Sequence, residues 1–235
     1  KDILAITPTV ASSFTPGLHP ELTGFKTLFE NKKLSFIANI GNLVKPTTRA
    51  EYLDGSGTLP SQLYSHSNQQ KQWQVLDTEE TKPGWAGRFA DLIQADNTSV
   101  IPPNINFSDS NPWQIGSSTK PYKMNPDGLI ELYGMNDKDD SWQAKRKEIF
   151  ERILNTTGKH EFEKAYIEIH KQSSSISTTL KALLEELPEI TTVYPENSNL
   201  GNQFLSAAKM IAIQKDLNMN RLVFFVKAGG YATHD

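Results

Sequence analysis

The sequence predicts an α/β fold, and two local patterns support this prediction. Near the start of the chain, a helix with an apolar stripe is followed, after a short turn, by a strand-like run over 34–40. Near the end, the almost continuous apolar run over 221–226 is typical of a strand that is covered on both faces of a sheet. Helix, turn and buried strand in this order are typical of an α/β unit.

The first predicted helix opens at His19-Pro20-Glu21 and ends before 31–33. Proline suits the first helical turn, and an acidic residue there interacts favourably with the helix dipole. Four apolar side chains share one face of this helix at helical spacing: Leu22, Phe25, Leu28 and Phe29. The strand predicted over 34–40 then closes at Gly41.

The middle of the chain predicts loops around two short helices. Residues 41–64 are rich in Gly, Pro, Thr and Ser and predict a long loop, a type that is often functional in compact domains. Helices are predicted over 67–74 and 85–94. Frequent proline and glycine turns over 97–135 predict a surface insertion of short strands and turns within one domain that spans 1–235.

Three further helices are predicted over 140–155, 159–187 and 199–217, before the apolar strand. That strand ends at Gly229-Gly230, which permits a sharp exit. Open α/β sheets place ligands at the carboxyl ends of their strands, and His234 and Asp235 follow there. Histidine and aspartate are good ligands for Zn, Mn or Fe. The alternative interpretation is a glycine turn with a polar surface tail.

Composition narrows the classes of function. Hydrophobic residues make up 37% and charged residues 22% of the 235 residues, as in a globular domain. The formal charge of -3 gives no electrostatic reason to expect nucleic acid or an anionic membrane as the main partner. The chain has no cysteine, which excludes disulfides, zinc–thiolate sites and a cysteine nucleophile. No apolar run approaches the roughly 20 residues that span a bilayer.

Ser65-His66-Ser67 stands at a predicted helix start, directly after the long loop. A serine hydroxyl there could accept a transferred group, with the helix N-terminus stabilising the negative charge. Ser65 and His66 are therefore candidate catalytic residues. The alternative is plain helix capping, which serine does frequently.

Several segments together resemble a known family, the large bacterial domain of unknown function numbered fifteen hundred and one. It is grouped with the alkaline phosphatase and sulfatase superfamily. The segments that carry the resemblance are LHPELTGFKTLFENKKLSFIANIG (18–41), LPSQLYSHSNQQKQWQ (59–74), GWAGRFADLI (84–93), LGNQFLSAAKMIA (200–212) and VFFVKAGGYATHD (223–235).

The resemblance implies an alkaline-phosphatase-like doubly wound sheet with helices on both faces. It also implies metal-supported hydrolysis of a small anionic phosphate or sulfate ester, with Zn, Mn, Mg or Ca as the divalent ion in the complete protein. Family members carry a twin-arginine export signal, so a periplasmic or secreted location is implied. This chain begins at Lys1-Asp2 without such a signal, as a processed or trimmed product does.

The sequence departs from the family pattern in three places. The family's opening Gly-Gly-x-Asp-Gly strand end is missing, and so are its later Ser-Asp-Phe-Gly-Arg and Asp-His-Gly segments. Ala232 stands where the family has an aspartate. We therefore expect a sheet that lacks strands at both ends, no tightly bound metal and no activity in this chain as given. A binding or structural protein with a degenerate metal site is the alternative function.

Overall fold

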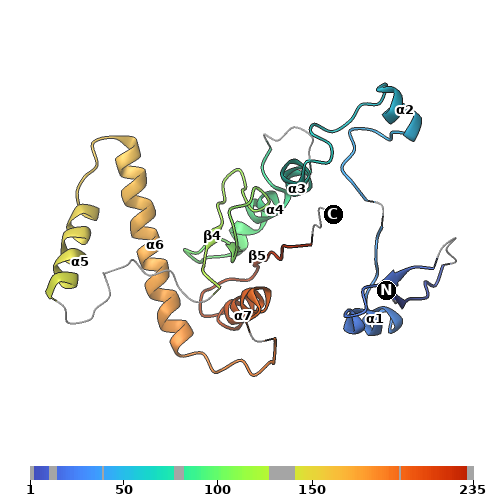
Figure 1. Ribbon diagram of the computed structural model, residues 1–235. Helices are drawn as coiled ribbons and strands as arrows, with labels where there is room; N and C mark the ends of the chain where they lie inside the picture. The colour runs from blue at the N-terminus through green and yellow to red at the C-terminus, as the bar shows by residue number, and fades with distance from the viewer. Residues whose placement is uncertain are drawn as a thin grey trace. The chain divides into compact units, whose positions relative to one another are not determined.

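The computed structural model describes residues 3–10, 15–38, 40–76, 82–126, 141–195 and 197–231. The chain divides into two compact units, Lys1–Gly41 and Asn42–Asp235. Within the described residues the fold is α/β, with seven α-helices, a three-stranded parallel sheet and a two-stranded antiparallel hairpin (Figure 1). None of the described helices is long and apolar enough to cross a bilayer.

The first unit is a small hairpin followed by one helix. Strand β1 (Leu4–Ala5) pairs antiparallel with β2 (Gly17–Leu18), and the Ile6 amide extends the pairing by donating to the Pro16 carbonyl at 3.1 Å. Helix α1 (Thr23–Glu30) confirms the first predicted helix. The strand predicted over 34–40 is wrong for the described residues, which are irregular and largely exposed. An apolar run becomes a strand only when a neighbouring strand pairs with its backbone groups.

The second unit begins with three helices. Helix α2 (Arg49–Asp54) lies inside the predicted loop and starts with a capping box between Thr48 and Glu51. Helices α3 (His66–Val75) and α4 (Trp85–Ile93) confirm the two short predicted helices. A short 3-10 turn, η1 (Gln94–Asp96), follows α4.

The sheet has the order β4-β3-β5 and all three strands are parallel. Strand β3 (Asn104–Asn106) is central, fully buried, and flanked by β4 (Tyr122–Lys123) and β5 (Val223–Phe225). The sequence predicts a surface insertion over 97–135, and the described part of that range supplies the central strand and several core side chains. Residues 127–135 lie outside the described residues.

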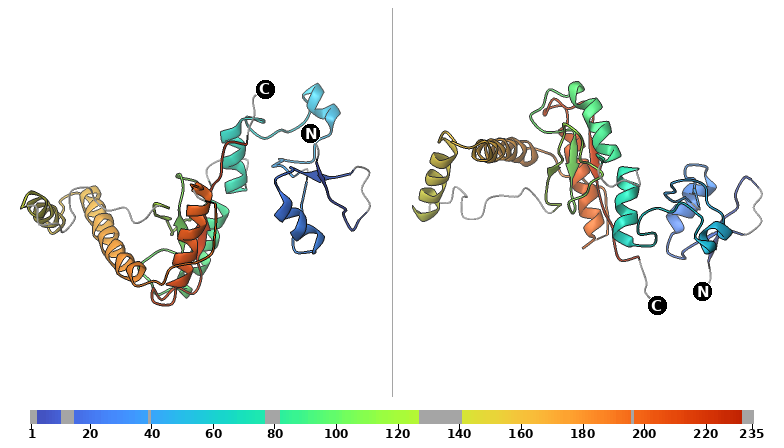
Figure 2. Two further views of the ribbon diagram at one scale, coloured as in Figure 1. Left: turned by 60° about the horizontal axis from the view of Figure 1, so that its bottom comes forward. Right: turned by 90° about the horizontal axis from the view of Figure 1, so that it is seen from above.

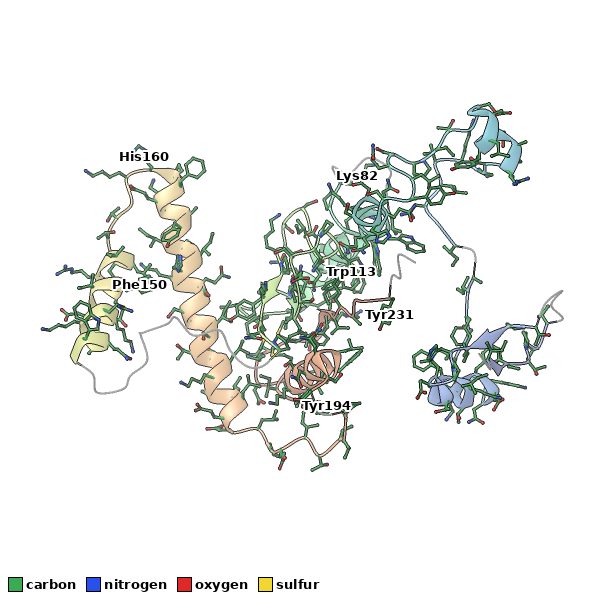
Figure 3. The ribbon with its side chains drawn as sticks, in the orientation of Figure 1. Lys82, Trp113, Phe150, His160, Tyr194 and Tyr231 are labelled. Atoms are coloured by element: carbon green, nitrogen blue, oxygen red, sulfur yellow. The ribbon has the colours of Figure 1, made fainter. Side chains whose placement is uncertain are left out.

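Two helices cover one face of this sheet. Helix α6 (Glu161–Glu185) contributes Ile176 and Leu180 to the core, and α7 (Asn199–Ala212) contributes Ala207 and Met210. These side chains pack in one cluster with Ile105 of β3, and the strands lie between α4 and α7 in Figure 1. Helix α5 (Ser141–Leu154) pairs with α6 as a hairpin (Figures 2 and 3). The ring centroids of Phe150 and His170 lie 5.8 Å apart between them.

Helix α4 lies on the other side of β3. The side chains of Asn104 and Ile105 point to opposite faces of the sheet, because successive side chains of a strand alternate. The Asn104 side chain donates to the Gln114 carbonyl, and the Gly87 amide of α4 donates to the Trp113 carbonyl at 2.9 Å. A Cβ at Gly87 would lie 2.2 Å from the Ile115 carbonyl carbon. Only glycine therefore lets α4 approach this segment so closely.

A carboxylate of α4 also holds the chain between β3 and β4. Asp91 accepts hydrogen bonds from the amides of Ser117, Ser118 and Thr119, at 2.7, 3.1 and 2.8 Å, and from the hydroxyls of Ser118 and Thr119. Partial burial raises the pKa of Asp91, but the bonds from Thr119, Ser117 and Ser118 together lower this pKa by more. The net result is a carboxyl pKa well below its ordinary value.

Candidate functional site

The carboxyl edge of the parallel sheet is the candidate site. All three strands are parallel, so their carboxyl ends meet at the same edge. The chain goes from the central β3 to β4 on one side and later returns to β5 on the other. In open α/β sheets, the strand ends at such a switch in strand order are where ligands bind.

Polar side chains shape the end of β3. Asn106 is the last residue of the strand; its Nδ2 donates to the Asp109 carbonyl at 3.0 Å, and its Oδ1 accepts from the Ser108 amide at 2.8 Å. These bonds turn the chain directly after β3. The turn brings the Asp109 carboxylate to 3.5 Å from the Lys227 ammonium, beyond the end of β5. Both charged groups are well exposed, so this pair marks the edge without adding much stability.

A buried glutamine holds the chain as it leaves β5. The Lys227 amide donates to Gln203 Oε1 at 2.8 Å, and Gln203 Nε2 donates to the Lys227 carbonyl at 3.0 Å. Gln203 is 1% exposed and belongs to α7, so its position is set by the packing of that helix. The side-chain amide pairs with the Lys227 backbone in the way that a neighbouring strand would. The path of the chain toward the glycine pair is thereby fixed.

The exit from β5 depends on glycine at one position. Gly230 has a φ of 83°, in the left-handed region where a side chain is strained. Gly229 and Gly230 have no atom within 4 Å of a built Cβ, so the requirement at Gly230 is conformational rather than steric. Tyr231 follows and is 81% exposed (Figure 3). Strand β5 thus ends at Phe225, before the predicted glycine pair, and of that pair only Gly230 adopts the left-handed conformation.

The predicted metal ligands His234 and Asp235 lie outside the described residues, and so does Ala232. Within the parts of the chain that the structure describes, no three His, Asp or Glu side chains gather as a metal site requires. A catalytic zinc generally takes three protein ligands.

The predicted catalytic residues Ser65 and His66 stand at the start of α3. Ser65 occupies the N-cap position with an extended backbone, but its hydroxyl accepts no bond from the helix amides. The Ser65 hydroxyl instead lies 3.3 Å from the hydroxyl of Ser67. Capping by the side chain of Ser65 is thus absent. His66 is the first helical residue and lines a shallow hollow of about 390 Å³ together with Gln69, Gln70, Trp73 and Gln74.

Sequence reasoning missed the residues that shape the edge. Gln203 lies within the LGNQF run that carries part of the family resemblance, yet a glutamine in a helix gives no sign of its partner. A polar residue on the buried face of an amphipathic helix, in line with Ala207 and Met210, was the available signal. Asn106 and Asp109 lie in the range predicted as a surface insertion.

Known proteins give no further support for a function. Comparison with protein-family models, with curated proteins and with solved structures finds no match to this chain. Support for a function therefore comes from the residues at the sheet edge and at the start of α3, and from the motifs that resemble the family.

Proposed function

We propose that this chain belongs to an alkaline-phosphatase-like, doubly wound α/β domain that hydrolyses phosphate or sulfate esters. Substrate binds at the carboxyl edge of β3 and β5. The observation that carries the proposal is the path of the chain after β5. There, Gln203 forms two hydrogen bonds with the Lys227 backbone, and Gly230 turns the chain with a left-handed conformation. This exit leads directly into Ala232-Thr233-His234-Asp235, which supplies a histidine and a carboxylate.

Each proposed residue has a chemical reason for its role. His234 and Asp235 are ligands for a divalent ion, which polarises an ester oxygen when it is bound. Ser65 is the nucleophile: its oxygen bonds to phosphorus or sulfur, the leaving alcohol departs, and water later releases the anion. His66, the next residue, is the proposed base that takes the serine proton. The first amides of α3 have no partner within the helix and favour negative charge.

The hydroxyl geometry supports Ser65 over a capping role. A capping serine uses its oxygen to accept from an amide of the first turn, whereas Ser65 leaves that oxygen beside Ser67. Its oxygen therefore accepts no bond from the first-turn amides and lies instead beside a hydroxyl of α3 itself. A serine hydroxyl that does not cap its helix supports the choice of Ser65 as the nucleophile.

One observation favours a second function. Ala232 stands where the resembling family has an aspartate, and the loss of that carboxylate removes charge that would hold a divalent ion. A non-catalytic binding or structural protein with a degenerate metal site is therefore the competing proposal. It predicts that Ala232→Asp increases metal binding.

Turnover by the full-length protein tests the proposal. The substrates are 4-nitrophenyl phosphate and 4-nitrophenyl sulfate, each assayed with added Zn, Mn, Mg or Ca. Ser65→Ala is expected to lower kcat by roughly 1000-fold or more, as loss of a nucleophile does. The control Ser61→Ala changes an exposed serine of the same loop and should leave kcat unchanged. Turnover that survives in Ser65→Ala contradicts the assignment.

A further inference from the structure

A second pocket opens beyond the carboxyl end of β4, on a different side of α7 from the buried core face. Four side chains at helical spacing on α7 form one of its walls: Asn202, Leu205, Ser206 and Lys209. The remaining lining comes from the segment after β4, from the end of α6 and from the α6–α7 connection: Met124, Asn125, Pro126, Leu184 and Tyr194. Its volume is about 290 Å³, the size of a site for a small organic molecule.

Specific contacts hold the walls of this pocket. The Ser206 hydroxyl donates to the Pro126 carbonyl at 2.9 Å, which ties α7 to the segment after β4. A Cβ at Gly201 would lie 2.6 Å from Cδ2 of the Tyr194 ring. The ring of Tyr194 can therefore rest against the first turn of α7 only because residue 201 is glycine (Figure 3). Packing and hydrogen bonding therefore define the walls of this pocket.

The lining combines an apolar base with a single charge. Met124 is buried, and Leu184, Leu205 and the Tyr194 ring supply apolar surface. Lys209 is the one charged residue among the lining side chains, and among the described residues its ammonium has no carboxylate within 4 Å. Ligand sites typically have this composition, a mostly apolar surface with a few polar groups that fix orientation.

We propose that this pocket binds a small organic anion, one negative group joined to a compact apolar or aromatic body. The Lys209 ammonium pairs with the anionic group, and the body lies against Tyr194, Leu184 and Leu205. A cation in the last turn of α7 also interacts favourably with the helix dipole, a role that Lys209 would have without any ligand. The proposal does not rest on ester hydrolysis at the sheet edge.

Binding of phenylacetate, with 2-phenylacetamide as the neutral probe of the same shape, tests the charge requirement. Titrations of the full chain are followed by NMR chemical shifts and repeated on Lys209→Gln, Lys209→Arg and Lys215→Gln. Lys215 is an exposed lysine six residues further on and lies outside the pocket lining. The dipole role of Lys209 alone predicts a change in helix stability but none in probe binding.

Phenylacetate is expected to bind wild type roughly fivefold more tightly than phenylacetamide, a ratio that corresponds to one partly exposed charge pair. Lys209→Gln should abolish this preference, while Lys209→Arg and Lys215→Gln keep it. The Tyr194 ring signals should shift with the same titration curve. Equal affinity for both probes, no saturable binding at millimolar concentrations, or an equal loss in Lys215→Gln overturns the proposal.

Discussion

Gln203 and the backbone of Lys227 form a reciprocal pair, in which each residue both donates and accepts a hydrogen bond. The pair joins the second turn of α7 to the chain just beyond β5, across 24 positions of sequence. Because Gln203 is buried, water cannot replace these hydrogen bonds when the pair breaks. The path of the chain after β5 therefore depends on hydrogen bonds from α7, a helix that precedes it in the sequence.

Gln203→Leu should lower the free energy of unfolding by about 2 kcal/mol, because two part-buried hydrogen bonds to the Lys227 N–H and C=O are lost. Urea denaturation measures this change. Gln214→Leu is the control, since no hydrogen bond is recorded for that side chain among the described residues. Equal losses for the two variants would show that the clamp contributes nothing specific.

The Asp91 carboxylate should make stability depend on pH. The pKa of Asp91 is lowered in the folded protein. Its contribution to the free energy of unfolding is therefore complete above the pKa of the unfolded chain, about 3.9, and is lost as pH falls toward the pKa of the folded protein. Asp91→Asn should cost about 1 to 2 kcal/mol at pH 7, with the loss shrinking below about pH 4. Urea unfolding of both proteins between pH 3 and 7 tests this; a pH-independent difference contradicts it.

Two glycine-to-alanine changes within helices should differ in their effect on stability. Gly87→Ala places a methyl group 2.2 Å from the Ile115 carbonyl carbon and should destabilise by about 2 kcal/mol or more. Gly24 in α1 has nothing within 4 Å of a built Cβ, so Gly24→Ala should be neutral or stabilise by up to about 1 kcal/mol.

Thermal unfolding of the two variants measures these effects, with the melting of each compared with wild type. The physical difference lies only in what surrounds the new methyl group. A Gly87→Ala protein as stable as wild type would mean that α4 does not lie directly on the 112–116 segment.

Helices were predictable because their signal is local. The apolar stripe of α4 and the long amphipathic pattern of α6 can be read from a few turns of sequence, and both helices are present. Helix α2 was also readable: Thr48 followed three residues later by Glu51 is a capping-box pattern within the predicted loop. The Gly, Pro, Thr and Ser residues around this pattern predict a loop instead.

Strands and the site depend on distant partners, which a sequence does not display. Residues 34–38 have strand-forming composition but no strand to pair with, whereas the short polar β3 is central because β4 and β5 flank it. The Gly229-Gly230 exit was visible as a motif. Its clamp by Gln203 was not, and neither was the bond between Asp91 and Thr119, 28 residues apart.

The most direct test of hydrolysis at the sheet edge is the effect of His234→Ala on turnover in the full-length protein. His234 is the proposed metal ligand, and His19, an exposed histidine of the first unit, provides the control His19→Ala. We predict divalent-ion-dependent turnover of 4-nitrophenyl phosphate or sulfate that falls roughly 100-fold or more in His234→Ala and is unchanged in His19→Ala. Absence of both metal and turnover in wild type, with Ala232→Asp restoring the metal, would contradict the proposal and favour a non-catalytic protein.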